Sequence, residues 1–175
     1  MISSISFRRI TFKDFERLHS DTAYAEAYFG LDIDADNDEV LTAYFEALEA
    51  SDRYLDLDKK WKDIHFLLTG ELPDAQATSL DSPCHKVCMG GAETQLDPLT
   101  YGIVRYLTIN EVEEIDQALS TIVVDNLQFR LANLLERDEH REFMKSLLFN
   151  LCIRLIKFFK EATQQGDIVL LSVTV

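Results

Sequence analysis

Two adjacent apolar stripes run along the last third of the chain, and they restrict its fold more than any other feature. Each stripe repeats every four residues, the first at Phe143, Leu147, Leu151 and Leu155 and the second at Met144, Leu148, Cys152 and Ile156. Residues four apart share one face of a helix, and two neighbouring stripes make a face wide enough for the centre of a core. The pattern predicts a long, central helix from about residue 138 to residue 163.

Three segments are typical of β-strands. Residues 168–175 are almost continuously apolar, as expected of a strand in the interior of a sheet. Residues 102–107 and residues 2–10 are the other two candidates, and 175 residues is the length of one ordinary domain. We therefore predict a single helix-rich α+β domain over residues 1–175, with a small sheet formed by the N-terminal, middle and C-terminal strands.

Helix boundaries are marked by capping residues elsewhere in the chain. Thr108 and Glu111 have the spacing of a capping box, in which each side chain bonds to the backbone N–H of the other residue. A helical stretch over residues 22–29 ends at Gly30, and apolar residues recur at helical spacing from Asp38 onward. These signals predict three further helices.

The segment from Leu55 to Gly70 contains the only Trp of the chain. We expect Asp56 or Asp58 to cap a helix here, and Gly70 to end it, because Gly adopts the left-handed conformation without strain. One face of that helix carries four residues at positions i, i+3, i+4 and i+7, namely Trp61, Ile64, His65 and Leu68.

His65 on this face has two interpretations. In the first, it is a core histidine that packs on Trp61 and bonds to the backbone through one ring nitrogen. In the second, it forms the wall of a pocket and titrates near neutral pH as an acid or base. Asp58 or Asp63 would then orient the ring.

The same segment has the order Asp-Lys-x-Trp-x-x-(Leu/Ile)-His-x-x-Leu-Thr-Gly, on Asp58, Lys59, Trp61, Ile64, His65, Leu68, Thr69 and Gly70. This order resembles a signature of the bacterial YfbM-like family, the domain of unknown function numbered 1877. The first strand and helix and the step from Tyr106 to Val112 are similar to that family as well. The resemblance implies a single α+β domain, and it carries over no catalytic residue.

The charge of the chain is −14 and is unevenly distributed. Residues 21–58 contain twelve acidic residues and one basic residue, Arg53. Such a field argues against nucleic acid and anionic membranes as partners, and it suits a basic protein. The alternative is a solvated acidic face that only maintains solubility.

Three Cys are too few and too unevenly spaced for a disulfide framework, so we expect reduced thiols and a cytoplasmic protein. The chain shows no signal peptide and no apolar run long enough to span a membrane. No Gly-rich phosphate loop or nucleophile elbow is present. We predict no cofactor, and whether the chain is an enzyme stays open.

Two segments resemble metal sites in part. The run from Asp32 through Asp34 to Asp36 opens like a calcium loop, but the twelfth position is Ala43 instead of the bidentate Glu that an EF-hand requires. Cys84 and Cys88 share a helix face and are candidate zinc ligands, but no second Cys/His pair follows. The sequence therefore predicts no metal site.

The leading functional hypothesis is a non-enzymatic binding module that recognises a basic protein. The contact surface would combine the acidic segment, including Asp34, Asp36, Asp38 and Glu39, with the irregular segment of residues 71–101. An immunity or antidote protein that neutralises a cationic toxin is one concrete form. The alternative is a small-molecule-binding protein or hydrolytic enzyme with a pocket around His65 and Trp61.

Overall fold

The computed structural model describes residues 2–34, 36–73, 82–135 and 141–175. It contains a five-stranded antiparallel sheet in the order β2-β1-β5-β4-β3. The strands are β1 (Ser4–Ile10), β2 (Tyr54–Asp58), β3 (Ala92–Glu93), β4 (Ile103–Leu107) and β5 (Ile168–Thr174). The three predicted strands are β1, β4 and β5, which lie side by side at the centre, so the predicted α+β class is confirmed.

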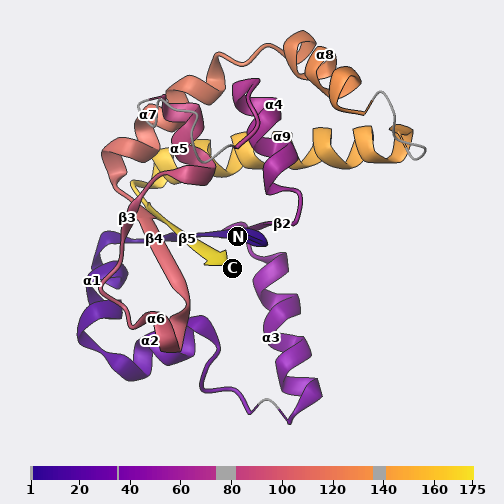
Figure 1. Cartoon of the computed structure of the whole chain (residues 1–175). Coiled ribbons are helices and arrows are strands. Elements are labelled where there is room, and N and C mark those ends of the chain that lie inside the picture. The colour runs from indigo at the N-terminus through magenta and orange to yellow at the C-terminus, as the bar shows by residue number, and fades with distance from the viewer. Residues whose placement is uncertain (1, 35, 74–81, 136–140) are drawn as a thin grey trace.

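Helices make up most of the remainder (Figure 1). They are α1 (Phe12–Ser20), α2 (Thr22–Phe29), α3 (Asp38–Ala50), α4 (Trp61–Thr69), α5 (Pro83–Met89), α6 (Pro98–Tyr101), α7 (Ile109–Ser120), α8 (Val124–Leu134) and α9 (Arg141–Gln165). The capping box at Thr108 and the left-handed glycine after α2 are both formed, as predicted. Within the described ranges, no helix is both long enough and apolar enough to cross a membrane.

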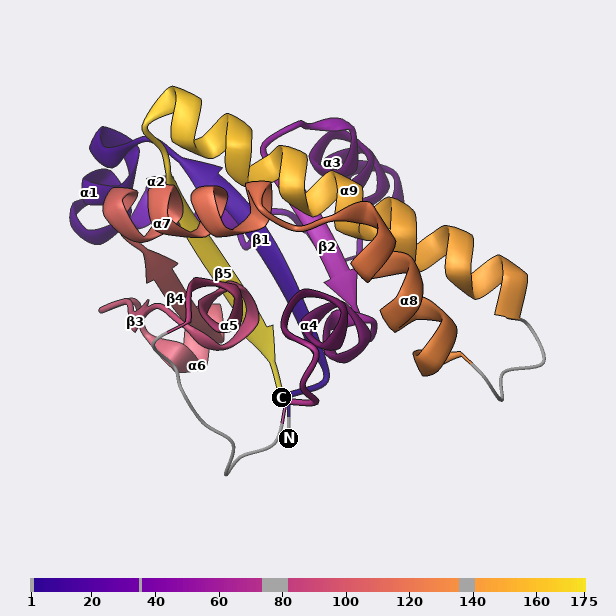
Figure 2. The ribbon, with the colours of Figure 1, turned by 90° about the horizontal axis from the view of Figure 1, so that it is seen from above.

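The two faces of the sheet are covered by different helices. Helices α4, α5, α7 and α9 lie over one face (Figure 2), where Phe7, Leu55 and Leu171 belong to the larger hydrophobic core. Helices α1 and α2 cover part of the opposite face around Ile10 and Leu170. The remainder of that opposite face lies between these helices and α3 (Figure 1).

Helix α9 confirms most of the two predicted stripes, because Leu148, Cys152 and Leu155 are buried. Phe143 is an exception, since 71% of it is exposed. The first turns of α9 extend past the edge of the sheet beside α8 (Figure 2), so the sheet does not cover that part of the stripe. The predicted start near residue 138 lies outside the described residues.

The predicted cap of α4 is wrong. Residues 54–58 form strand β2, in which Leu55 and Leu57 are buried while Asp56 and Asp58 are exposed. Alternation of apolar and acidic residues is the pattern of a strand with one buried face. Helix α4 begins only at Trp61, after Lys60, and has no side-chain cap.

The face and the end of α4 are as predicted. Trp61, Ile64, His65 and Leu68 are all buried, and Leu67 is buried with them. Gly70 ends the helix with φ of 81°, and its N–H donates to the carbonyl oxygen of Phe66 at 2.7 Å.

Candidate functional site

Helix α3 has no buried residue. Every other α-helix of eight or more residues whose burial is described throughout has at least one. The contacts of α3 with the rest of the protein are sparse. Its main anchor is Tyr44, whose hydroxyl donates to the carbonyl oxygen of Tyr28 at 3.1 Å and accepts from Arg8 at 3.2 Å. The ring of Tyr44 lies against Gly30, where an added Cβ would be 2.8 Å from it. Tyr44 therefore holds the middle of α3, and the half-buried Leu41 and Leu48 lie about one turn before and one turn after it.

Arg8 supports this anchor from the sheet. Its guanidinium lies 5.3–5.7 Å from the ring centres of Tyr28, Phe29 and Tyr54, and it donates to the carbonyl oxygen of Tyr28 at 2.6 Å. Burial raises the pKa of the Tyr28 hydroxyl. The aromatic groups thus fix the end of α2 and the middle of α3 to one strand.

The structure brings four of the predicted binding residues together at the start of α3. Asp34, Asp36, Asp38 and Glu39 are all exposed. Asp34 is turned inward on its own loop, since one carboxylate oxygen accepts from the backbone N–H of Asp36 at 3.0 Å. In the part of the chain that the structure describes, no group of three or more His, Cys, Asp or Glu could hold a metal ion.

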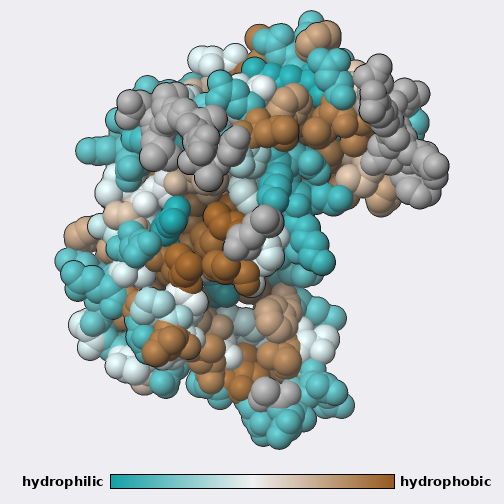
Figure 3. Space-filling view, viewed as in Figure 1, coloured by the Kyte–Doolittle hydropathy of each residue, from teal (hydrophilic) through white to brown (hydrophobic). Residues whose placement is uncertain are grey.

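Apolar side chains accompany these carboxylates. About half of each of Leu31, Val40 and Phe45 is exposed. No Lys or Arg occurs between Arg17 and Arg53 in the sequence. We call residues 31–34 and 36–50 the acidic arm. On the face of the molecule shown in Figure 3, hydrophobic residues lie on either side of a hollow.

A groove follows the open edge of β2 between α3 and α9. One cavity of about 310 Å³ is lined by Glu49, Tyr54, Asp56 and Arg154. Tyr54 and Arg154 also line an adjoining cavity of about 130 Å³. The two cavities share these two lining residues, and we call them together the β2 groove.

A cluster of charges lies beside the β2 groove. The guanidinium of Arg9, whose side chain is 2% exposed, lies 2.9 Å from Glu161, 3.5 Å from Asp52 and 3.6 Å from Asp167. Arg53 lies 3.3 Å from the same oxygen of Asp167. Buried charges are tolerated only when paired, so this cluster fixes the ends of β1 and β5 and the segment before β2.

His65 lies apart from the acidic arm, on the other side of the sheet. It is 2% exposed, and its ring centre is 5.2 Å from that of His85. Nε2 of His85 lies 3.2 Å from a carboxylate oxygen of Glu71. Burial, assisted by His85, lowers the pKa of His65, although Glu71 opposes the shift.

The predicted surroundings of His65 are formed only in part. Nδ1 of His65 is buried without a hydrogen-bond partner among the described residues, so that nitrogen makes no backbone bond. Asp58 and Asp63 make no hydrogen bond to the ring; Asp58 is exposed, and burial raises the pKa of Asp63. Trp61 is 4% exposed and belongs to the core.

The cysteines are placed unlike metal ligands. Cys88 is buried beneath α4, with Sγ 3.9 Å from the carbonyl oxygen of Trp61, and burial raises its pKa to about 12. Cys84 is half-buried, and burial raises its pKa as well. Both are free thiols in α5.

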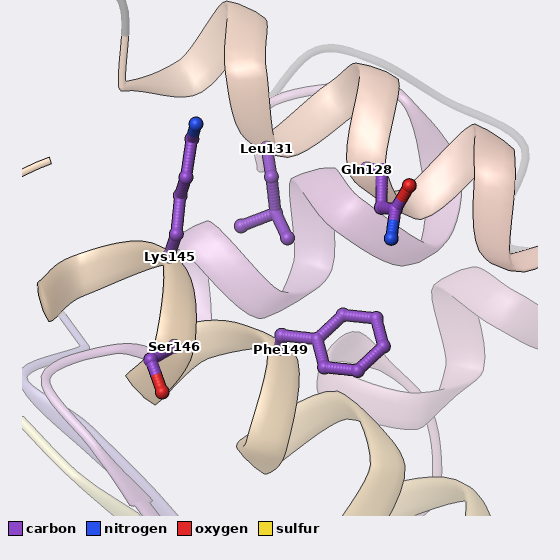
Figure 4. A pocket seen from close by; sticks show the side chains of 5 residues that line it. All are labelled: Gln128, Leu131, Lys145, Ser146 and Phe149. Atoms are coloured by element: carbon purple, nitrogen blue, oxygen red, sulfur yellow. The ribbon is translucent and has the colours of Figure 1, made fainter. Parts of the chain in front are cut away.

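A further cavity, of about 370 Å³, lies between α8 and α9. Leu131 and Gln128 of α8 point toward Phe149 of α9, with Lys145 at one end (Figure 4). Another cavity of about 360 Å³ lies between α1, α2 and the segment that contains α6. None of these cavities is lined by Trp61 or His65.

Sequence reasoning missed His85 and Arg154. His85 lies between the two cysteines considered as zinc ligands, and the sequence does not indicate its contact with His65 because the approach of α5 to α4 is a tertiary contact. Arg154 lies among the residues of the two apolar stripes, between Cys152 and Leu155, and the pattern there indicates no role for it. Arg154 lies near Asp56 because residues 54–58 form strand β2. The alternation of apolar and acidic residues in that segment is the sequence pattern that indicates this strand.

Comparisons with known proteins agree with this fold. The family described as "Domain of unknown function (DUF1877)" matches residues 1–172. The crystal structure of YfbM from Escherichia coli, a protein of unknown function, is similar with a TM-score of 0.59 and 18% identity over 99% of this chain and 100% of that one. No curated protein matches the chain. Because the family match spans nearly the whole sequence, the protein belongs to the DUF1877 family.

Proposed function

We propose that the protein is a non-enzymatic, cytoplasmic binding module that recognises a basic protein through the acidic arm. The observation that carries this proposal is α3, a helix of 13 residues without a buried residue. It presents Val40 and Phe45 to solvent among carboxylates.

The composition of the arm favours a binding role over a structural one. Helical stability in proteins comes mostly from packing of an apolar face, and α3 contributes little to the core. Exposed apolar side chains surrounded by like charges suit a partner that offers the opposite charge and an apolar contact. Complementary charge of this kind speeds encounter and selects the partner more than it raises affinity.

An immunity or antidote protein that neutralises a cationic toxin is one form of this function. The charge would attract the toxin, and Val40 and Phe45 would provide the contact that holds it. The product of a neighbouring gene with a strongly basic sequence is the first partner to test.

Binding should be measured with purified partner and two matched variants. The arm variant carries Asp34→Asn, Asp36→Asn, Asp38→Asn and Glu39→Gln. The control removes the same number of exposed charges elsewhere, with Glu16→Gln, Glu93→Gln, Glu113→Gln and Asp125→Asn. We expect the arm variant to lose at least tenfold in association rate at low salt and the control to lose little.

Salt provides the second readout. Raising the ionic strength should weaken binding of the wild type and the control, and it should change binding of the arm variant less. Equal loss in both variants would mean that total charge, rather than the acidic arm, governs binding, and the proposal would be wrong.

A second candidate is a small-molecule site or hydrolytic centre at His65, favoured by its contact with His85 and the hydrogen bond from His85 to Glu71. The low pKa of His65 would keep the ring neutral, as a base requires. Any measured activity should fall in His65→Gln and in Glu71→Gln. Activity that survives both changes would remove this candidate.

A further inference from the structure

Strand β2 is an edge of the sheet, and on its outer side the N–H of Tyr54 already donates to the carbonyl oxygen of Ser51 at 3.4 Å. It pairs with β1 alone, and Arg9 donates its N–H to the carbonyl oxygen of Arg53 at 2.9 Å. Because alternate residues of an antiparallel pair turn their backbone groups toward the partner strand, Leu55 faces β1. The backbone N–H and C=O of Asp56 therefore point outward, away from the sheet.

The outward side of Asp56 opens into the β2 groove. Helix α3 forms one wall through Glu49, and α9 forms the other through Arg154. Arg154 makes no hydrogen bond or ion pair within the described residues, and it lines both cavities of the groove. The groove thus presents an open strand edge between a carboxylate on one side and a guanidinium on the other.

The opposite edge of the sheet differs. Strand β3 has two residues, whereas β2 has five. Exposed edges attract additional strands unless they are short, covered or otherwise protected. The edge of β2 is regular over residues 54–56, before the register shift opposite Ile5 and Ser6 and the positive φ of 45° at Asp58. This short edge and the groove beside it are the part of the sheet suited to accept a strand.

We propose that the β2 groove binds an extended segment of a partner protein, which adds to the sheet as a strand beside β2. This inference deepens the proposed function and rests on it for the basic character of the partner. Successive side chains of a strand point to opposite faces. Those on the side of α3 are Lys or Arg, which meet Glu49 and Asp56, and one on the side of α9 is acidic, which meets Arg154.

The binding mode explains why the groove needs few side-chain pockets. In strand addition, backbone hydrogen bonds provide affinity and alternate side chains provide specificity. Asp56 contributes to both, through its N–H and C=O at the edge and through its exposed carboxylate, one oxygen of which also accepts from the N–H of Asp58 at 2.7 Å. Glu49 belongs to the acidic arm, so a partner seated in the groove touches both surfaces.

The probe is the peptide acetyl-Lys-Val-Lys-Glu-Lys-Val-amide, which has Lys on one side of a strand and Glu on the other. Titrated into ¹⁵N-labelled protein, it should shift the amide resonances of Tyr54 and Asp56 and slow hydrogen exchange of the Asp56 amide. Two versions N-methylated at alternate residues should differ, because only one set of peptide N–H groups faces β2.

Two substitutions at one position separate the backbone from the side chain. Asp56→Ala removes the carboxylate and keeps the N–H, whereas Asp56→Pro removes both. A proline is tolerated on an edge strand where the N–H faces solvent, and thermal melting verifies that both variants fold. We expect Asp56→Pro to bind the peptide at least tenfold more weakly than Asp56→Ala.

Failure of this inference is distinguishable from failure of the proposed function. If Asp56→Pro binds as well as Asp56→Ala, or if shifts are confined to residues 32–39, strand addition is wrong while the acidic arm keeps its role. If the peptide binds in the groove but the four-residue arm variant still binds the basic partner normally, the groove stands and the arm is not the binding surface.

Discussion

Helices α3 and α4 are close in the sequence and opposite in their surroundings. Five of the nine residues of α4 are buried, whereas none of the 13 residues of α3 is. Both carry apolar residues at helical spacing. Each also meets a glycine in the left-handed conformation: α4 ends at Gly70, and the ring of Tyr44 in α3 lies against Gly30. The difference lies in what each helix meets. Helix α4 packs against α5, α8 and α9 as well as β2, whereas α3 contacts β2 and is held to Tyr28 and Arg8 through the hydroxyl of Tyr44.

This difference separates a structural helix from a candidate binding helix. Trp61 of α4 is an apolar side chain that is buried in the core. Phe45 of α3 is a comparable group that remains half exposed among carboxylates. Removing each one should therefore have opposite effects on stability and on binding.

The largest expected effect is that of Trp61→Ala. Deleting a large buried aromatic side chain costs about 3–5 kcal/mol in the free energy of unfolding, and a domain has only about 5–15 kcal/mol in total. Thermal and denaturant melts should show a much less stable protein. A melting temperature within a degree of the wild type would mean that Trp61 is exposed in solution, and α4 would then be the binding helix.

Gly30→Ala should have the next largest effect and should act on α3 and on the end of α2, which Gly30 caps. The left-handed conformation at φ of 73° costs a residue with a Cβ about 1–2 kcal/mol, and the added Cβ would displace the ring of Tyr44. Hydrogen exchange should speed up along α3 and stay unchanged in α4. Gly70→Ala is the matched control, because its Cβ would meet only the Arg130 side chain at 3.4 Å. Faster exchange in α4 as well in the Gly30→Ala variant would contradict an effect confined to the contacts of Gly30.

Acidification should weaken α4 through His65. Burial lowers the pKa of His65 below its ordinary value of 6.5, so the unfolded chain takes up a proton before the folded protein does. The contribution of His65 to stability is therefore complete above pH 6.5 and is lost as the pH falls through the lower folded pKa.

Denaturant melts between pH 7.5 and pH 5.5 measure this loss. The wild type should lose more stability over that range than His65→Gln, which cannot titrate. Parallel pH profiles for the two proteins would show that His65 is accessible to protons in the folded state, and that result would strengthen its candidacy as an acid or base.

The sequence predicted those parts of the fold in which local pattern and burial agree. The face of α4, the capping box at Thr108 and the three central strands follow from spacing that the core enforces. The strand at residues 54–58 was overlooked because its acidic residues were interpreted as a helix cap, although their alternation with Leu55 and Leu57 has the period of a strand. Phe143 was assigned to the core because periodicity reveals a face and not the length of the sheet beneath it.

The candidate sites were less accessible to sequence reasoning. The acidic arm was predicted from charge alone, since an unbroken run without Lys or Arg needs no tertiary information. The His65–His85 contact and the β2 groove each join segments that are distant in the chain, α4 with α5 and β2 with α9. No spacing rule within one segment can place such groups together.

The smallest expected effect on stability is that of Phe45→Ser. Surface substitutions usually change the free energy of unfolding by about 0.5 kcal/mol or less; half of Phe45 is exposed, and its ring meets that of Tyr44 edge-on with ring centres 5.4 Å apart. Melts should therefore be almost unchanged, while affinity for the basic partner should fall tenfold or more, because aromatic anchors dominate many interfaces. A variant that loses stability instead would show that α3 packs more tightly than its exposure indicates. A variant that keeps both stability and affinity would show that the carboxylates alone form the binding surface. The contrast between α3 and α4 would then be one of charge and not of an exposed apolar face.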